Sequence, residues 1–73
     1  MSASEVAHLR VQVELEYEAM VRGLSGFAEG SAMHDFISAR MARIEGYHSE
    51  LTREVGESEA TQIICELYNK TIH

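Results

Sequence analysis

The chain has 73 residues, of which 45% are hydrophobic and 25% charged, with no proline and one cysteine. This composition is typical of a folded globular domain and excludes fibrous, disordered and disulfide-stapled proteins. Twelve acidic and six basic side chains give a net charge of −6, which repels the phosphates of nucleic acids and anionic lipid surfaces.

The first predicted helix spans residues 4–29. Ser2 and Glu5 have the form of a capping box at its start, and Gly30 suits its C-terminal cap. Gly23 indicates either a close approach of another helix or a local loss of helix propensity. The hydrophobic side chains of this first helix recur at spacings of three and four, which places them along one narrow stripe. This stripe comprises Val6, Leu9, Val13, Tyr17, Met20, Leu24 and Phe27.

The second predicted helix spans residues 32–55, with Ser31 as its cap and Gly56 at its end. Gly46, in the middle of this helix, leaves the same two alternatives as Gly23. Because the connection near Gly30 is short, the first two helices should form an antiparallel hairpin. The second helix repeats the helical spacing with Met33, Ile37, Met41, Ile44, His48, Leu51 and Val55.

The third predicted helix spans residues 59–72 and is capped by Ser58. Its hydrophobic side chains cover roughly 200° of its circumference, which is too broad for one docking side. At about 20 Å it is also too short to cover a hairpin nearly twice as long. The prediction is an all-α domain over residues 1–73 that assembles as a dimeric helix bundle. The broad set comprises Ala60, Ile63, Ile64, Cys65, Leu67, Tyr68 and Ile72.

These features predict a small, non-catalytic interaction protein, either an assembly subunit or a regulatory adaptor. Its expected partners are a second copy of the chain and another protein that binds the third helix. Nucleic acid and membrane are not expected partners. The residues predicted to form the core and the interface are Val13, Tyr17, Met20, Leu24, Ile37, Ile44, His48, Leu51, Ile64, Leu67 and Tyr68.

The size of the chain and its single cysteine set further expectations. A chain this short buries only about 60% of the surface that its unfolded form exposes, so it needs a partner subunit or a metal. Most enzymes that surround a substrate are longer, which argues against catalysis. The start of the chain lacks the pattern of a secretory signal, and no apolar run approaches the roughly 20 residues of a transmembrane helix. Cys65 is the single cysteine, which fits a reducing compartment. Together these features predict a cytoplasmic protein.

A metal site is the alternative function. Glu45 and His48 have the Glu-x-x-His spacing, which places a carboxylate and an imidazole one turn apart on a helix. Glu16 lies at about the same level on the preceding helix. This arrangement resembles the ferritin-like proteins, among them small encapsulated ferritins whose metal site lies at a dimer interface. The resemblance implies an iron site held by Glu16, Glu45 and His48, whereas the helical positions favour boundary charges, with Glu16 paired to Arg40 or Arg43.

The segment Leu51–Thr61 also resembles the middle of a helix-turn-helix protein, in which a helix ends at glycine and a second helix reads DNA. Such a helix is unsuited to DNA, because it carries the acidic residues Glu59 and Glu66 and a single basic residue, Lys70. An ordinary helix corner at Gly56 is therefore the expected structure.

Overall fold

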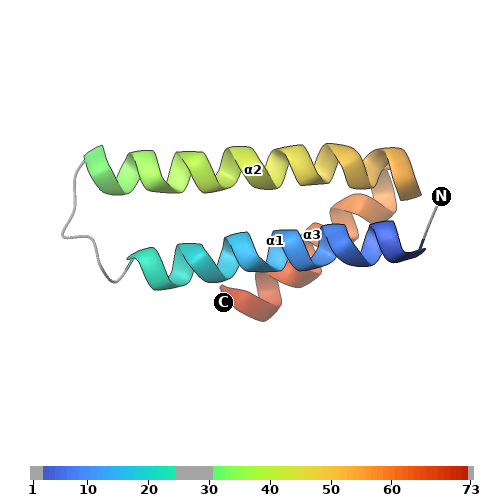
Figure 1. Ribbon diagram of the computed structural model, residues 1–73, viewed down its shortest axis with the longest axis horizontal. Helices are drawn as coiled ribbons and strands as arrows, with labels where there is room; N and C mark the ends of the chain where they lie inside the picture. Colours follow the sequence, from blue (N-terminus) through green and yellow to red (C-terminus); the bar gives the residue numbers. More distant parts are fainter. Residues whose placement is uncertain (1–2, 25–30, 73) are drawn as a thin grey trace.

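The computed structural model describes residues 3–24 and 31–72, which form three α-helices and contain no strand. They are α1 (Ala3–Leu24), α2 (Ser31–Val55) and α3 (Glu57–Thr71). Helices α1 and α2 lie side by side and antiparallel, and α3 turns back from the end of α2 and passes along α1 (Figure 1). Each helix contacts the other two. The prediction of an all-α chain with three helices is confirmed.

The predicted boundaries of the first two helices agree with the structure where it describes the chain. Helix α2 begins one residue before its predicted start and ends at the predicted residue, while α1 begins one residue early. The expected continuation of α1 to residue 29, with Phe27 and the Gly30 cap, lies outside the described residues. Ser2 of the predicted capping box lies outside them as well. No described helix has the length and apolar character needed to cross a membrane.

The start of α3 differs from the prediction, because Ser58 does not cap it. The N-cap is Gly56, at φ 92° and ψ 160°, and no side chain makes a capping hydrogen bond there. The Gly56 amide donates to the Thr52 carbonyl at 2.9 Å, and its own carbonyl accepts from the Ala60 amide at 3.0 Å. One glycine thus ends α2 and begins α3, using a positive φ that other residues rarely adopt. The predicted helix end at Gly56 is confirmed, whereas Ser58 lies in the first turn of α3.

The hydrophobic core lies where α3 covers the hairpin. Leu51 and Val13 are its largest fully buried side chains, both 0% exposed. The broad apolar set of α3 divides into a side that faces the hairpin and a side that does not, since Cys65 and Tyr68 are exposed. The stripe of α2 also departs from the prediction at Met41, which is 48% exposed. The buried core comprises Leu9, Val13, Tyr17, Met20, Ile44, Leu51, Ala60, Ile63 and Leu67.

The two mid-helix glycines have different roles. A Cβ on Gly23 would lie 2.6 Å from Cε2 of Phe36, so the aromatic ring of α2 occupies the space above this glycine. A Cβ on Gly46 would meet nothing within 4 Å. Gly23 therefore permits a close approach of α1 and α2, whereas Gly46 only lowers helix propensity.

This difference predicts opposite effects of the same substitution. Gly46→Ala should raise the free energy of unfolding by about 1 kcal/mol through helix propensity. Gly23→Ala should lower it, because displacing a packed ring costs about 1–3 kcal/mol and exceeds that gain. Urea unfolding followed by circular dichroism compares the two variants directly. An equal stabilisation by both would show that Phe36 does not pack over Gly23.

Candidate functional site

A groove of about 520 Å³ lies between α2 and α3. Tyr17 of α1 contributes to its lining, and Met41 in the lining is 48% exposed. Hydrophobic side chains thus meet small and polar ones in an open depression. The groove is lined by Tyr17, Ser38, Met41, Ala42, Ile44, Glu45, His48, Thr61 and Ile64.

Two hydrogen bonds involve His48 at this groove. His48 Nε2 and Thr61 Oγ1 lie 3.1 Å apart and form a hydrogen bond between α2 and α3. The Thr52 hydroxyl donates to the His48 carbonyl at 2.9 Å. The first of these hydrogen bonds holds α3 against α2 at the edge of the groove, whereas the second lies within α2.

Tyr17 meets Tyr68 of α3 edge to face, with ring centroids 5.6 Å apart. Burial raises the pKa of the Tyr17 hydroxyl above its ordinary value of 10.0, and the nearby Cys65 and Tyr68 raise it further. Tyr17 therefore stays neutral near pH 7. Tyr68 remains 47% exposed despite this contact.

Three charged side chains of α3, those of Glu59, Glu66 and Lys70, lie on the side that faces α1. Lys70 Nζ lies 3.0 Å from Glu14 Oε2, and Arg10 of α1 lies 3.6 Å from Glu66 Oε1. Glu59 precedes Glu66 by seven residues, two helical turns, and so shares that side. The opposite side of α3, which borders the groove, carries Thr61, Ile64, Cys65 and Tyr68.

We call this surface the uncharged face and define it by Met41 and Ala42 of α2 and by Thr61, Ile64, Cys65 and Tyr68 of α3. Glu45, which lines the groove, and Glu57, which precedes Ile64 by seven residues, lie at its margin. Depletion of charge, together with exposed Met and Tyr side chains, is typical of the centre of a protein–protein interface. The surface can therefore bury apolar area without burying unpaired charge.

The residues predicted for the core and interface have three different environments within one chain. Those buried in it are Val13, Tyr17, Met20, Ile44, Leu51 and Leu67. Ile37, His48 and Ile64 are partly buried, and Tyr68 is exposed. The side chain of Leu24 lies outside the described part of the structure. Ile64 and Tyr68 thus belong to the uncharged face, and the buried residues Tyr17 and Ile44 line the groove beside it.

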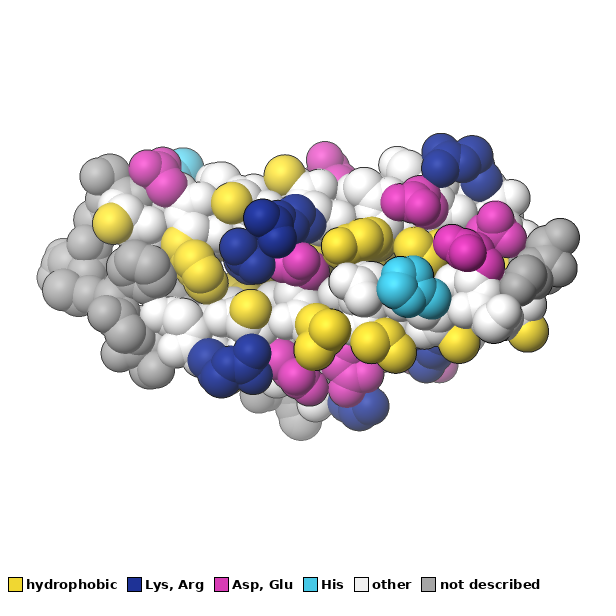
Figure 2. All heavy atoms as spheres, viewed as in Figure 1, with side chains coloured by type: hydrophobic (Ala, Val, Ile, Leu, Met, Phe, Trp, Pro, Cys, Tyr) yellow, Lys and Arg dark blue, Asp and Glu magenta, His cyan; other side chains and the backbone are white. Residues whose placement is uncertain are grey.

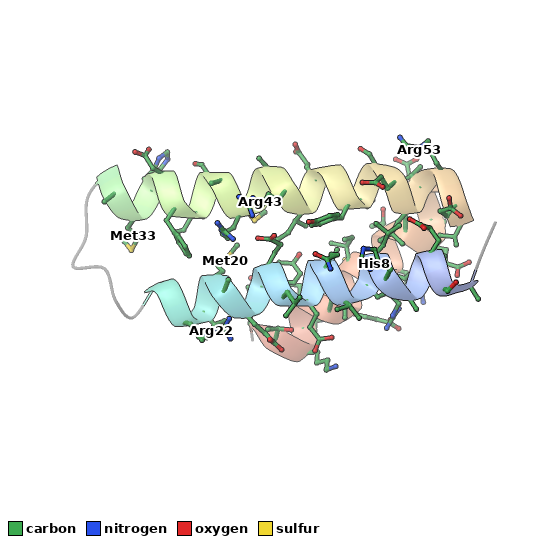
Figure 3. The ribbon with its side chains drawn as sticks, viewed as in Figure 1. His8, Met20, Arg22, Met33, Arg43 and Arg53 are labelled. Atoms are coloured by element: carbon green, nitrogen blue, oxygen red, sulfur yellow. The ribbon has the colours of Figure 1, made fainter. Side chains whose placement is uncertain are left out.

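Glu16 lies between α1 and α2 and is buried, at 7% exposure. Its Oε1 accepts a hydrogen bond from Arg40 at 2.9 Å, and its Oε2 lies 3.7 Å from Arg43. Arg43 points from α2 toward α1 (Figure 3). Arg40 also lies over the Phe36 ring, 5.3 Å from its centroid. The predicted pairing of Glu16 with Arg40 or Arg43 is confirmed for both arginines.

The residues of the predicted metal site are divided between two places. Glu45 and His48 line the groove, whereas Glu16 is not among its lining residues. Among residues 3–24 and 31–72, no three His, Cys, Asp or Glu side chains are grouped so that they could hold a metal ion. An iron ion bound through Glu45 and His48 would therefore need ligands from outside the described residues of one chain.

Three groove residues were not anticipated, namely Ser38, Ala42 and Thr61. They are small or polar, so they leave no trace in a hydrophobic periodicity. Ser38 and Ala42 lie four residues apart on α2, a spacing that places them on the same side of a helix. A search for uncharged sides as well as apolar ones would have found them.

Comparisons with protein-family models, with curated proteins and with solved structures gave no match to this chain.

Proposed function

We propose that this protein is a non-catalytic assembly subunit that works as a homodimer joined through the uncharged face. The observation that carries the proposal is the pair of exposed side chains Met41 and Tyr68, at 48% and 47% exposure, on a surface from which charge is directed away. Burying them against a second copy would remove apolar area from water without stranding a charge.

Charge favours a second copy as the occupant. Each chain carries a net charge of −6, so two copies repel each other wherever their acidic residues meet. A twofold interface places the same surface on both sides, which makes an uncharged surface the most suitable one. A partner of opposite charge would instead call for acidic residues at the centre of this surface.

The dimensions of the molecule are sufficient for such an interface. A stable interface typically takes about 800 Å² from each partner. The molecule measures 42 × 19 × 18 Å, so one long side offers an area of this order. Because a 73-residue chain has a small core, its folded state is only marginally stable alone. A dimer interface would stabilise it.

Light scattering coupled to size-exclusion chromatography tests the proposal. The wild-type protein should have twice the chain mass of 8.2 kDa. Met41→Lys should give a monomer, because it places a charge in the interface. Leu15→Lys is the matched control, since Leu15 is also 48% exposed but lies on α1 outside the uncharged face, and it should leave the dimer intact.

Two results would contradict the proposal. One is a wild-type monomer at about 100 μM, a concentration at which a dimer with a micromolar dissociation constant is largely intact. The other is an equal loss of the dimer in both lysine variants, which would show that the uncharged face is not the interface.

A further inference from the structure

A second groove, of about 720 Å³, lies on the other side of α3, between α3 and the first half of α1. We name it the acidic groove. Val6, Val55 and Ile63 supply apolar side chains to its lining, and Ile63 is only 6% exposed. Its lining also holds the acidic residues Glu57, Glu59 and Glu66.

The charge of this groove is unbalanced. Arg10 is the basic residue in its lining, and its guanidinium lies 3.6 Å from Glu66. Glu57 and Glu59 add two further carboxylates in the first turn of α3. They complement the positive end of the helix dipole, equivalent to about half an elementary charge, so negative charge remains.

The surroundings of the groove reinforce this imbalance. Glu50 and Glu54 lie in the last turns of α2, where Arg53 is the basic residue. Figure 2 shows acidic side chains close together at the end of the molecule where α1 begins and α2 ends. These carboxylates add to the excess of acidic over basic side chains at this end of the molecule.

We propose that the acidic groove binds a basic amphipathic helix of another protein. Apolar side chains of that helix would pack on the partly exposed Val6 and Val55, while its lysines or arginines would meet Glu57 and Glu59. This chemistry follows from the lining, because an apolar floor alone would accept any hydrophobic segment and the carboxylates select a basic one. Glu59, Ile63 and Glu66 of the groove lie on a different side of α3 from Ile64 and Tyr68, so the dimer can bind the helix.

Binding is tested with a fluorescent 18-residue peptide of leucine and lysine patterned as an amphipathic helix, titrated with the full-length protein. A peptide with glutamate in place of lysine serves as the reference for charge. The lysine peptide should bind, more weakly in high salt, and the glutamate peptide should not.

Paired variants separate the groove from the net charge. Glu57→Gln with Glu59→Gln should weaken binding about tenfold, as expected for the loss of two charge contacts. Glu18→Gln with Asp35→Asn removes the same charge elsewhere and should change it little. Ser58→Trp should also weaken binding, because a bulky ring in the lining fills the groove without changing its charge.

Equal weakening by the two paired variants would overturn the proposal, because it would reduce binding to the net charge. So would unchanged binding by Ser58→Trp. The variant Met41→Lys should keep its affinity for the lysine peptide. A loss in that variant would place the peptide on the uncharged face and not in the acidic groove.

Discussion

Leu51→Ala is expected to lower the free energy of unfolding by about 2–5 kcal/mol, the range for truncating a fully buried leucine. Leu51 is 0% exposed and belongs to the core that joins the three helices. Small domains have a total stability of only about 5 kcal/mol, so much of the variant should be unfolded at 25 °C. Circular dichroism with urea titration measures the change.

Leu15→Ala is the matched control for this experiment. The two positions share one residue type and one substitution, but Leu15 is 48% exposed, so its loss should stay within about 0.5 kcal/mol. A charged substitution, Leu51→Asp, should unfold the protein and, if the proposed dimer forms, dissociate it at the same time, since association would then be coupled to folding. A Leu51→Ala variant that unfolds at the wild-type urea concentration would contradict the packing of α3 on the hairpin.

Much of the fold could be predicted because the governing signals are local. The spacings of three and four along both long helices identify their buried sides, and Gly56 marks the corner before α3 because few other residues accept its positive φ. The predicted start of α3 was wrong, because Gly56 and not Ser58 is its N-cap. A serine near a helix start favours an N-cap at Ser58, but the Gly56 carbonyl already accepts from Ala60, which puts Ser58 inside the helix.

The candidate site was harder to predict because it depends on how α3 crosses the hairpin. The broad apolar set of α3 correctly indicated that its hydrophobic side chains exceed one docking side, and Tyr68 is exposed accordingly. The sequence does not tell which helix faces the charged side of α3. The ion pairs of Lys70 with Glu14 and of Glu66 with Arg10 show that this helix is α1. Periodicity gives the sides of a helix, while only the packing tells which neighbour each side meets.

Glu16→Ala is expected to destabilise the protein by about 2 kcal/mol, because it removes a charged hydrogen bond from a largely buried site. Arg40 would lose its partner at 2.9 Å, and its buried Nε already has no hydrogen-bond partner in the described structure. Glu18→Ala is the control, since its ion pair with Arg22, at 3.9 Å, is exposed and should contribute less than about 0.5 kcal/mol.

The same variants distinguish the ion pair from the metal site that the Glu-x-x-His spacing suggests. If Glu16 stabilises the protein through Arg40, Glu16→Ala should unfold at a lower temperature by the same amount with and without Fe²⁺. If Glu16 binds iron with Glu45 and His48, Fe²⁺ should raise the wild-type melting temperature, and both Glu16→Ala and His48→Ala should abolish that rise. The ion pair predicts a further result, because replacing Glu16 and Arg40 together with leucine should recover part of the lost stability. No recovery would mean that Glu16 acts through a contact other than Arg40.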